Sequence, residues 1–194
     1  MLRYLRGEAG SVPRPALFLD RDGVLNTHIV DGYVIEPRDF EPIDIALGAA
    51  AAAQDLGAAL VVVSNQGVIG RELATEADIM VIHGMLLDVL SKHGIALDAI
   101  YICPHHPKAP DPRRRVCECR KPKPGMILSA ARDLNLDVPA SILIGDQPSD
   151  LGAAHAAGIA EGRALMIGSV PVDLTDWVVA ALSSTRRTGP RPAT

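Results

Sequence analysis

Residues 16–26 read ALFLDRDGVLN, and the architecture of the chain follows from this stretch. It begins with a short, continuous apolar run, residues 16–19, which passes without a break into Asp20, Arg21 and Asp22. A continuous apolar run of this length is typical of a strand buried on both faces, as in a parallel sheet covered by helices. Charged side chains directly after such a strand lie at its carboxyl end, where open α/β sheets bind their ligands.

Polar residues follow two further buried strand candidates in the same way. Residues 59–63 are followed by SNQG, residues 64–67, and residues 141–144 by GDQPSD, residues 145–150. Any one of these clusters is also explained as a turn or a helix cap, because Asp and Asn are common there. If the three strands are neighbours, four carboxylates, a hydroxyl and an amide from distant parts of the chain converge on one site.

Apolar runs alternate with helical patterns through the rest of the chain. Helices are predicted at 44–56, 75–93, 125–135, 149–157 and 173–183, and further strands at 99–102 and 164–167. This alternation predicts an α/β fold, a Rossmann-like parallel sheet with helices on both faces. The spaces between the three polar clusters are too short for a large cap domain. We expect an N-terminal arm at 1–15, one folded domain at 16–185 and a disordered tail at 186–194.

Composition excludes several classes of function. The 194 residues carry a formal net charge of −4, so no overall basic field gathers nucleic acid or binds an anionic membrane surface. No stretch approaches the roughly 18 consecutive apolar residues of a membrane span, and the first residues lack the apolar core of a secretory signal. We therefore expect a cytoplasmic protein that acts as a monomer on a small molecule, without nucleic-acid or membrane partners.

The clustered carboxylates indicate metal-assisted phosphoryl transfer. Unpaired buried carboxylates are costly, and Mg²⁺ removes that cost because it binds carboxylate oxygens together with water and phosphate. Asp20 and Asp146 are the expected side-chain ligands. One aspartate can attack phosphorus and form an acyl phosphate. Asp22, two residues further on, can protonate the leaving alcohol and later activate water.

The stretch RKPKPG, residues 120–125, supplies the cations that such a site requires. A fixed positive charge stabilises the transferring phosphate, and Lys121 is the expected residue. Arg120 beside it offers a planar fork for a substrate oxygen, whereas Lys123 suits a solvated loop.

Four motifs resemble, in order and spacing, those of the haloacid dehalogenase superfamily of phosphatases. They are DRDGVLN at 20–26, SNQ at 64–66, RKPKPG at 120–125 and GDQPSD at 145–150. The resemblance covers about residues 16–180 and is closest to the bacterial heptose-1,7-bisphosphate 7-phosphatase group, which is related to histidinol-phosphate phosphatases.

The resemblance implies a role for each matching residue. Asp20 is the nucleophile and Asp22 the general acid and base. Mg²⁺ is held by the Asp20 and Asp146 carboxylates and the Asp22 backbone carbonyl. Ser64 and Lys121 steady the transferring phosphoryl group. Further substrate contacts are expected from Asn65, Gln66, Gly67, Arg120, Asp31, Gly32 and Tyr33.

A second metal site is predicted in the proline-rich loop between residues 103 and 119. Two short pairs bracket it, and Cys103, His105, Cys117 and Cys119 match the ligands of a structural zinc site. A disulfide and free packed cysteines remain alternatives, and His106 could replace His105. The resembling heptose phosphatases carry the same CPHHP…CxCRKP arrangement.

We therefore expect hydrolysis of the 7-phosphate of a heptose 1,7-bisphosphate, with Arg120 and Arg71 available to the phosphate that remains. A histidinol-phosphate phosphatase, another small phosphomonoesterase and a DNA 3′-phosphatase are the enzymatic alternatives. The alternative of a different class is a non-catalytic interaction module that uses the zinc loop.

Overall fold

The computed structural model describes residues 1–168 and 172–184 and contains one six-stranded sheet. The strand order is β1-β4-β3-β2-β5-β6, and every pair is parallel except β1 with β4. The strands are β1 (Leu2–Leu5), β2 (Ala16–Leu19), β3 (Ala59–Asn65), β4 (Ala99–Cys103), β5 (Ile142–Gly145) and β6 (Ala164–Met166). β2 lies between β3 and β5, so the three strands with polar ends are neighbours, which is the condition for their polar residues to converge on one site.

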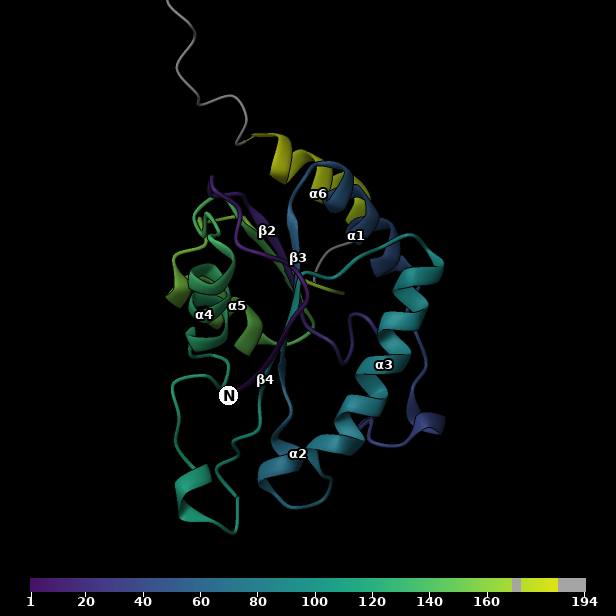
Figure 1. Cartoon of the computed structure of the whole chain (residues 1–194), viewed down its shortest axis with the longest axis vertical. Coiled ribbons are helices and arrows are strands. Elements are labelled where there is room, and N and C mark those ends of the chain that lie inside the picture. The colour runs from purple at the N-terminus through teal and green to yellow at the C-terminus, as the bar shows by residue number, and fades with distance from the viewer. Residues whose placement is uncertain (169–171, 185–194) are drawn as a thin grey trace, which may run out of the picture.

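Helices cover both faces of the sheet (Figure 1). They are α1 (Ile45–Asp55), α2 (Gly67–Gly70), α3 (Glu76–Lys92), α4 (Gly125–Leu134), α5 (Pro148–Ala157) and α6 (Leu174–Ser183). Alternate residues of each strand face opposite layers, so Leu17 and Leu19 pack in the core with α1, α3 and α6. Phe18 packs in the other core, with α4 and α5. The predicted α/β architecture is confirmed.

Within the predicted N-terminal arm, residues 2–5 form β1 and extend the sheet beyond β4. Leu2 and Tyr4 turn toward the core, and Arg3 on the other face forms an ion pair of 2.8 Å with Asp133 of α4. An antiparallel edge strand that is half exposed shows only weak apolar alternation over four residues, so its sequence carries little signal.

Two long connections follow the carboxyl ends of the strands, residues 26–43 and 104–124. They contain only the short 3₁₀ turns Pro37–Asp39 and Pro112–Arg114. The second connection lies beside α2 at the lower end of the sheet in Figure 1. No cap domain is present among the described residues, and none of their helices combines the length and apolar character of a bilayer crossing. The predicted tail at 186–194 lies outside the described residues.

Candidate active site

Three carboxylates meet at the carboxyl ends of β2 and β5. Oxygen atoms of Asp20, Asp146 and Asp150 all lie within 4.8 Å of one another. Gly23 allows the two strand ends to approach, because it has φ of +83° and a Cβ there would overlap the Asp146 carboxylate. The sequence thus brings together the first and fourth motifs as predicted.

Lys121 is buried against this cluster. Its Nζ lies 2.9 Å from Asp20 Oδ2 and 2.5 Å from Asp150 Oδ1, and it donates to the Val63 carbonyl at 2.8 Å. The three protons of the ammonium therefore have three acceptors. Burial lowers the pKa of Lys121, but the Asp20 and Asp150 charges outweigh burial and the pKa lies above its usual value. Lys121 is a fixed cation.

The excess of negative charge around Asp20 is compatible with a bound divalent cation. Burial raises the pKa of Asp20 to about 6 even though Lys121 lowers it, and the neighbouring Asp150 and Asp22 charges raise it further. Carboxylates outnumber cations in this part of the described structure, and the buried Asp146 Oδ1 has no hydrogen-bond partner. A cluster of carboxylate oxygens with an unpartnered atom fits Mg²⁺, which prefers such ligands.

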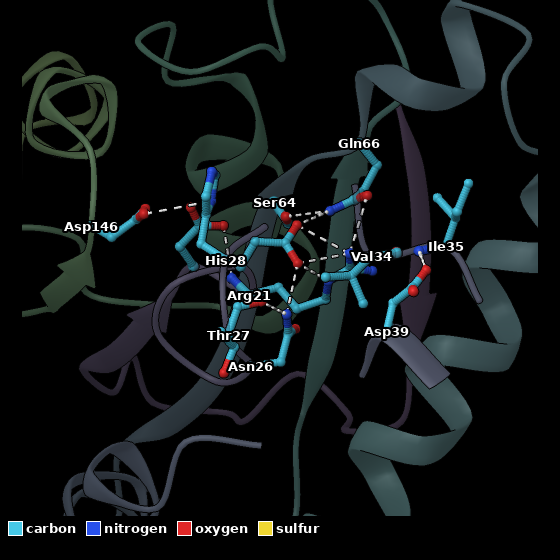
Figure 2. Close-up of polar contacts among 12 residues, drawn as sticks. Arg21, Asn26, Thr27, His28, Val34, Ile35, Asp39, Ser64, Gln66 and Asp146 are labelled. Atoms are coloured by element: carbon cyan, nitrogen blue, oxygen red, sulfur yellow. Dashed lines mark hydrogen bonds and ion pairs between the residues drawn. The ribbon is translucent and has the colours of Figure 1, made fainter. Parts of the chain in front are cut away.

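Asp22 does not join this cluster but is held by the buried side chains of Arg21, Asn26 and Gln66, which Figure 2 labels. Arg21 donates to Asp22 Oδ1 from Nε at 3.0 Å and from Nη2 at 2.8 Å, and Nη2 lies 3.0 Å from Oδ2. Asn26 Nδ2 donates to Oδ1 at 2.9 Å, and Gln66 Nε2 donates to Oδ2 at 2.8 Å. Burial raises the pKa of Asp22, but Arg21 and these hydrogen bonds outweigh it and lower the pKa below its usual value.

The second motif points inward from the end of β3. Asn65 pairs with the Lys121 backbone, accepting from its N–H at 3.0 Å and donating to its carbonyl at 3.1 Å. Gln66 also donates to Ser64 Oγ at 2.9 Å and is only 3% exposed. The amides of Asn65 and Gln66, both predicted to bind substrate, are thus engaged with Lys121, Asp22 and Ser64.

The 26–43 connection brings His28 to the edge of the site and carries the predicted residues Asp31 and Tyr33. His28 Nδ1 lies 3.8 Å from Asp146 Oδ2, and Figure 2 labels both residues. Tyr33 accepts a hydrogen bond of 2.6 Å from Arg71, whose guanidinium carbon also lies 5.7 Å from the centre of the Tyr33 ring. The neighbouring Asp31 is exposed, and its carboxylate has no polar partner among the described residues.

Arg120 is held by a hydrogen bond to the loop of residues 103–119, here called the cysteine loop. Its Nη1 donates to the His105 carbonyl at 3.1 Å. A Cβ on Gly67 would press against His106 and Arg120, and one on Gly70 would overlap the Pro104 carbonyl. The two glycines of α2 therefore let the cysteine loop pack closely against the end of β3.

The predicted zinc ligands form a compact cluster. The Cys103 Sγ atom lies 3.6 Å from Cys117 Sγ, 3.2 Å from Cys119 Sγ and 3.6 Å from His105 Nδ1. A tetrahedral zinc ion has about 3.8 Å between sulfur ligands and about 3.5 Å between sulfur and nitrogen, from the usual bond lengths. His106 faces elsewhere, since its Nδ1 accepts from the Lys108 N–H at 3.0 Å. The donor set fits a four-coordinate metal, and none of the three cysteines is in a disulfide.

Two buried groups near Asp22 were not singled out as functional from the sequence. Arg21 is fully buried. Its position between two candidate catalytic aspartates is the sequence feature that could have identified it. His83 of α3 is also fully buried, with its ring edge toward Tyr4 at 6.1 Å between centroids. Burial first, and then the Arg21 charge, lower the pKa of His83 to about 3.

The neutral state of His83 leads to a pH dependence of stability. The unfolded chain binds a proton at this residue below about pH 6.5, whereas the folded chain resists it until about pH 3. Stability is therefore full above the unfolded pKa and falls as pH drops toward the folded one. Between about pH 7.5 and pH 4.5, wild type should lose about 2.5 kcal/mol more than His83→Leu in denaturant unfolding. His155→Leu, which removes an exposed histidine from α5, is the control, and its free energy of unfolding should change with pH as that of wild type does. If the free energy of unfolding changes with pH equally in wild type and His83→Leu, the assigned effect of His83 is refuted.

The chain is similar to known proteins in sequence and in fold. The HAD-hydrolase-like family model matches residues 118–168. The D-glycero-beta-D-manno-heptose-1,7-bisphosphate 7-phosphatase of Yersinia pestis is 40% identical over 175 residues, which cover 87% of this chain and 92% of the relative. The protein of that name from Escherichia coli (strain K12) is 41% identical, with 87% and 90% covered.

A solved structure shares the fold. The D,D-heptose 1,7-bisphosphate phosphatase of B. bronchiseptica, complexed with magnesium and phosphate, superposes with a TM-score of 0.71 at 29% identity. The match covers 89% of this chain and 98% of that one. The chain therefore belongs to the HAD-like hydrolases and, within them, to the family of the heptose-1,7-bisphosphate 7-phosphatases.

Proposed function

We propose that this phosphatase hydrolyses the 7-phosphate of D-glycero-β-D-manno-heptose 1,7-bisphosphate through a phosphorylated Asp20. The observation that carries the proposal is the cluster of Asp20, Asp146 and Asp150 oxygens within 4.8 Å, with the Lys121 ammonium 2.9 Å from Asp20. The names of the relatives from Yersinia pestis and Escherichia coli support the choice of substrate.

Mg²⁺ is the proposed catalytic cofactor, held by the carboxylates of Asp20 and Asp146 and the backbone carbonyl of Asp22. When bound, it supplies positive charge to the phosphate oxygens and so lowers the repulsion between phosphate and an attacking carboxylate. The unpartnered Asp146 Oδ1 supports this assignment, and Asp150 is proposed to hold Lys121 beside the metal ligands.

Asp20 is proposed to attack phosphorus with a carboxylate oxygen while the bond to the leaving oxygen breaks. Lys121 and Ser64 hold the transferring group, and Asp22 gives a proton to the leaving oxygen. Asp22 is ionised in the free protein, so it takes up a proton from solvent when the negative charge of a bound phosphate raises its proton affinity. In the second half of the reaction Asp22 takes a proton from the water that attacks phosphorus, and the Asp20 carboxylate is released.

Substrate recognition is assigned to the two long connections. Arg120 and the Asp31–Tyr33 segment are the proposed sugar and phosphate contacts, with Arg71 oriented by Tyr33. Gly67 lets His106 and Arg120 lie close to its backbone. Asn65 contributes by holding the Lys121 backbone, and Gln66 contributes by holding the Asp22 carboxylate. The protein is proposed to be a cytoplasmic monomer, and the free thiols support the location because disulfides are rare in the cytoplasm. The phosphatase domain is proposed to span residues 16–185 together with β1.

A substrate panel tests the proposed reaction. The purified chain is assayed for phosphate release from both anomers of heptose 1,7-bisphosphate, histidinol phosphate and a 3′-phosphorylated oligonucleotide. We expect the highest kcat/KM for the β-anomer and loss of all activity with a Mg²⁺ chelator. A higher kcat/KM for histidinol phosphate would reassign the substrate. No magnesium-dependent turnover of any of these would remove the catalytic assignment and favour the interaction module.

The cysteine loop is proposed to bind Zn²⁺ through Cys103, His105, Cys117 and Cys119 as a structural site. The ion would fasten the loop that carries Arg120 and Lys121, since Cys119 directly precedes them. Four protein ligands leave no open position for water, so no chemistry is assigned to this metal.

Neighbouring histidines provide a matched test of the zinc site. His105→Asn is expected to lose zinc in elemental analysis and about 3 kcal/mol of stability, a fall in Tm of roughly 6–12 °C for a chain of this size. His106→Asn should keep zinc at the wild-type stoichiometry, because its ring lies outside the cluster. Wild-type protein without zinc, or equal zinc content in the two variants, would disprove the assignment.

A further inference from the structure

Arg21 is a charged residue in a place where charge is expensive. It ranks among the largest fully buried side chains and has an exposed fraction of 0%. A buried guanidinium is tolerated only when it is paired and hydrogen-bonded, and an unpaired one costs several kcal/mol. The fold therefore maintains this side chain at a specific position for a reason beyond packing.

The shortest contacts of Arg21 are with Asp22. Its Nε and Nη2 both donate to Asp22, and Nη2 also lies 3.3 Å from the Val34 carbonyl and from Gln66 Oε1. Nη1 has no partner among the described residues, nor has either ring nitrogen of His83. A neutral His83 nearby places no second positive charge against the guanidinium.

Because Arg21 has no exposed surface, it cannot meet a phosphorylated substrate directly. Any effect of this residue on the reaction must pass through the groups that it holds, and among these the Asp22 carboxylate is the one with a proposed role in proton transfer. Asn26 and Gln66 complete the arrangement from two other directions, and both are buried, with exposed fractions of 0% and 3%. Figure 2 shows the three side chains grouped together below and beside Ser64.

We infer that Arg21 is a positioning residue for proton transfer: its buried fork fixes the direction in which Asp22 presents its proton to the leaving oxygen. The inference rests on the proposed function, in which Asp22 is the acid. An arginine suits this task because its planar donors engage the carboxylate at two points and so define an orientation, whereas an ammonium acts as a point charge.

Leaving-group dependence distinguishes positioning of an acid from a general structural effect. In the first half of the reaction the Asp20–phosphorus bond forms, the bond from phosphorus to the leaving oxygen breaks, and that oxygen receives the electron pair and the Asp22 proton. Phenolate, from a phenol with a pKa of about 10, needs this proton far more than 4-nitrophenolate, which is a weaker base. The two aryl phosphates are of similar size and are independent of the identity of the sugar substrate.

The experiment measures kcat/KM of the magnesium-loaded full chain for phenyl phosphate and 4-nitrophenyl phosphate. Arg21→Met should lose about 10²-fold on phenyl phosphate and less than about 10-fold on 4-nitrophenyl phosphate. Arg21→Lys should show a smaller loss with the same preference. The ratio between two substrates is measured in one preparation, so it does not depend on the fraction of folded protein.

Two reference variants separate the possible outcomes. Arg3→Met removes an arginine with a 54% exposed side chain on β1 and should leave both rates unchanged. Asp22→Asn should show a selective loss at least as large as that of Arg21→Met, and the double variant should lose little more. If both Arg21 variants lose equally on the two substrates while Asp22→Asn loses selectively, the positioning role of Arg21 is refuted and the acid role of Asp22 stands. An Asp22→Asn variant without selectivity would overturn it together with the acid role of Asp22.

Discussion

Asp20→Asn is expected to reduce turnover by at least about 10⁴-fold, because an amide oxygen cannot take the place of the carboxylate nucleophile. The side chain is 8% exposed, its carboxylate contacts Lys121 Nζ at 2.9 Å, and burial raises its pKa to about 6. The substitution keeps the shape of the side chain and removes one of several crowded negative charges. The free energy of unfolding should therefore change by no more than about 1 kcal/mol, which thermal unfolding measures.

Asp88→Asn is the matched control for this substitution. Asp88 is exposed on α3, and the same change there should leave both the rate of phosphate release and Tm unaltered. Turnover of Asp20→Asn within about tenfold of wild type would exclude Asp20 as the nucleophile. A variant that loses activity only in proportion to a loss of folded protein would leave the chemical role without support.

Lys121→Met is expected to impair both activity and folding. The buried ammonium lies between Asp20 and Asp150, and its removal leaves two carboxylates facing each other without a fixed cation. Loss of one partner from a buried charge pair costs about 3–5 kcal/mol. In addition, kcat/KM should fall by about 10³-fold, because the developing charge of the transferring phosphoryl group loses a preorganised donor.

Lys123→Met provides the comparison within the same loop. The Lys123 side chain is 44% exposed and pairs with the exposed Glu118, and surface pairs of this kind contribute about 0–1 kcal/mol. It should retain wild-type turnover and nearly all of the stability. Similar denaturant midpoints for the two variants would show that Lys121 is not the counter-charge of the carboxylate cluster.

The strands around the site could be predicted because their signal is local. Each buried strand is a continuous apolar run, and the polar residues at the ends of β2, β3 and β5 follow directly from those runs. β1 could not be predicted in this way, since its four residues alternate weakly and depend on pairing with β4, almost a hundred residues away in the sequence. A tertiary contact, not a sequence pattern, makes it a strand.

The direction of individual side chains was less accessible from the sequence. The second motif marks the end of β3 correctly, but nothing in SNQ indicates that Asn65 binds the Lys121 backbone or that Gln66 turns toward Asp22. Arg21 is similar, because an arginine in a polar stretch usually lies at the surface, whereas here the Asp22 carboxylate and the Val34 carbonyl hold it inside. The positions of these side chains depend on how the neighbouring loops pack in the tertiary structure.

An acyl phosphate on Asp20 can be trapped chemically and located in the sequence. Magnesium-loaded protein is mixed with substrate and quenched with sodium borohydride, which reduces an acyl phosphate to an alcohol and so converts the phosphorylated aspartate into homoserine. Peptide mapping should find homoserine at position 20, only with substrate and Mg²⁺, and not at position 22 or 146. Homoserine at another aspartate, or none while phosphate is being released, would contradict the reaction proposed for this chain.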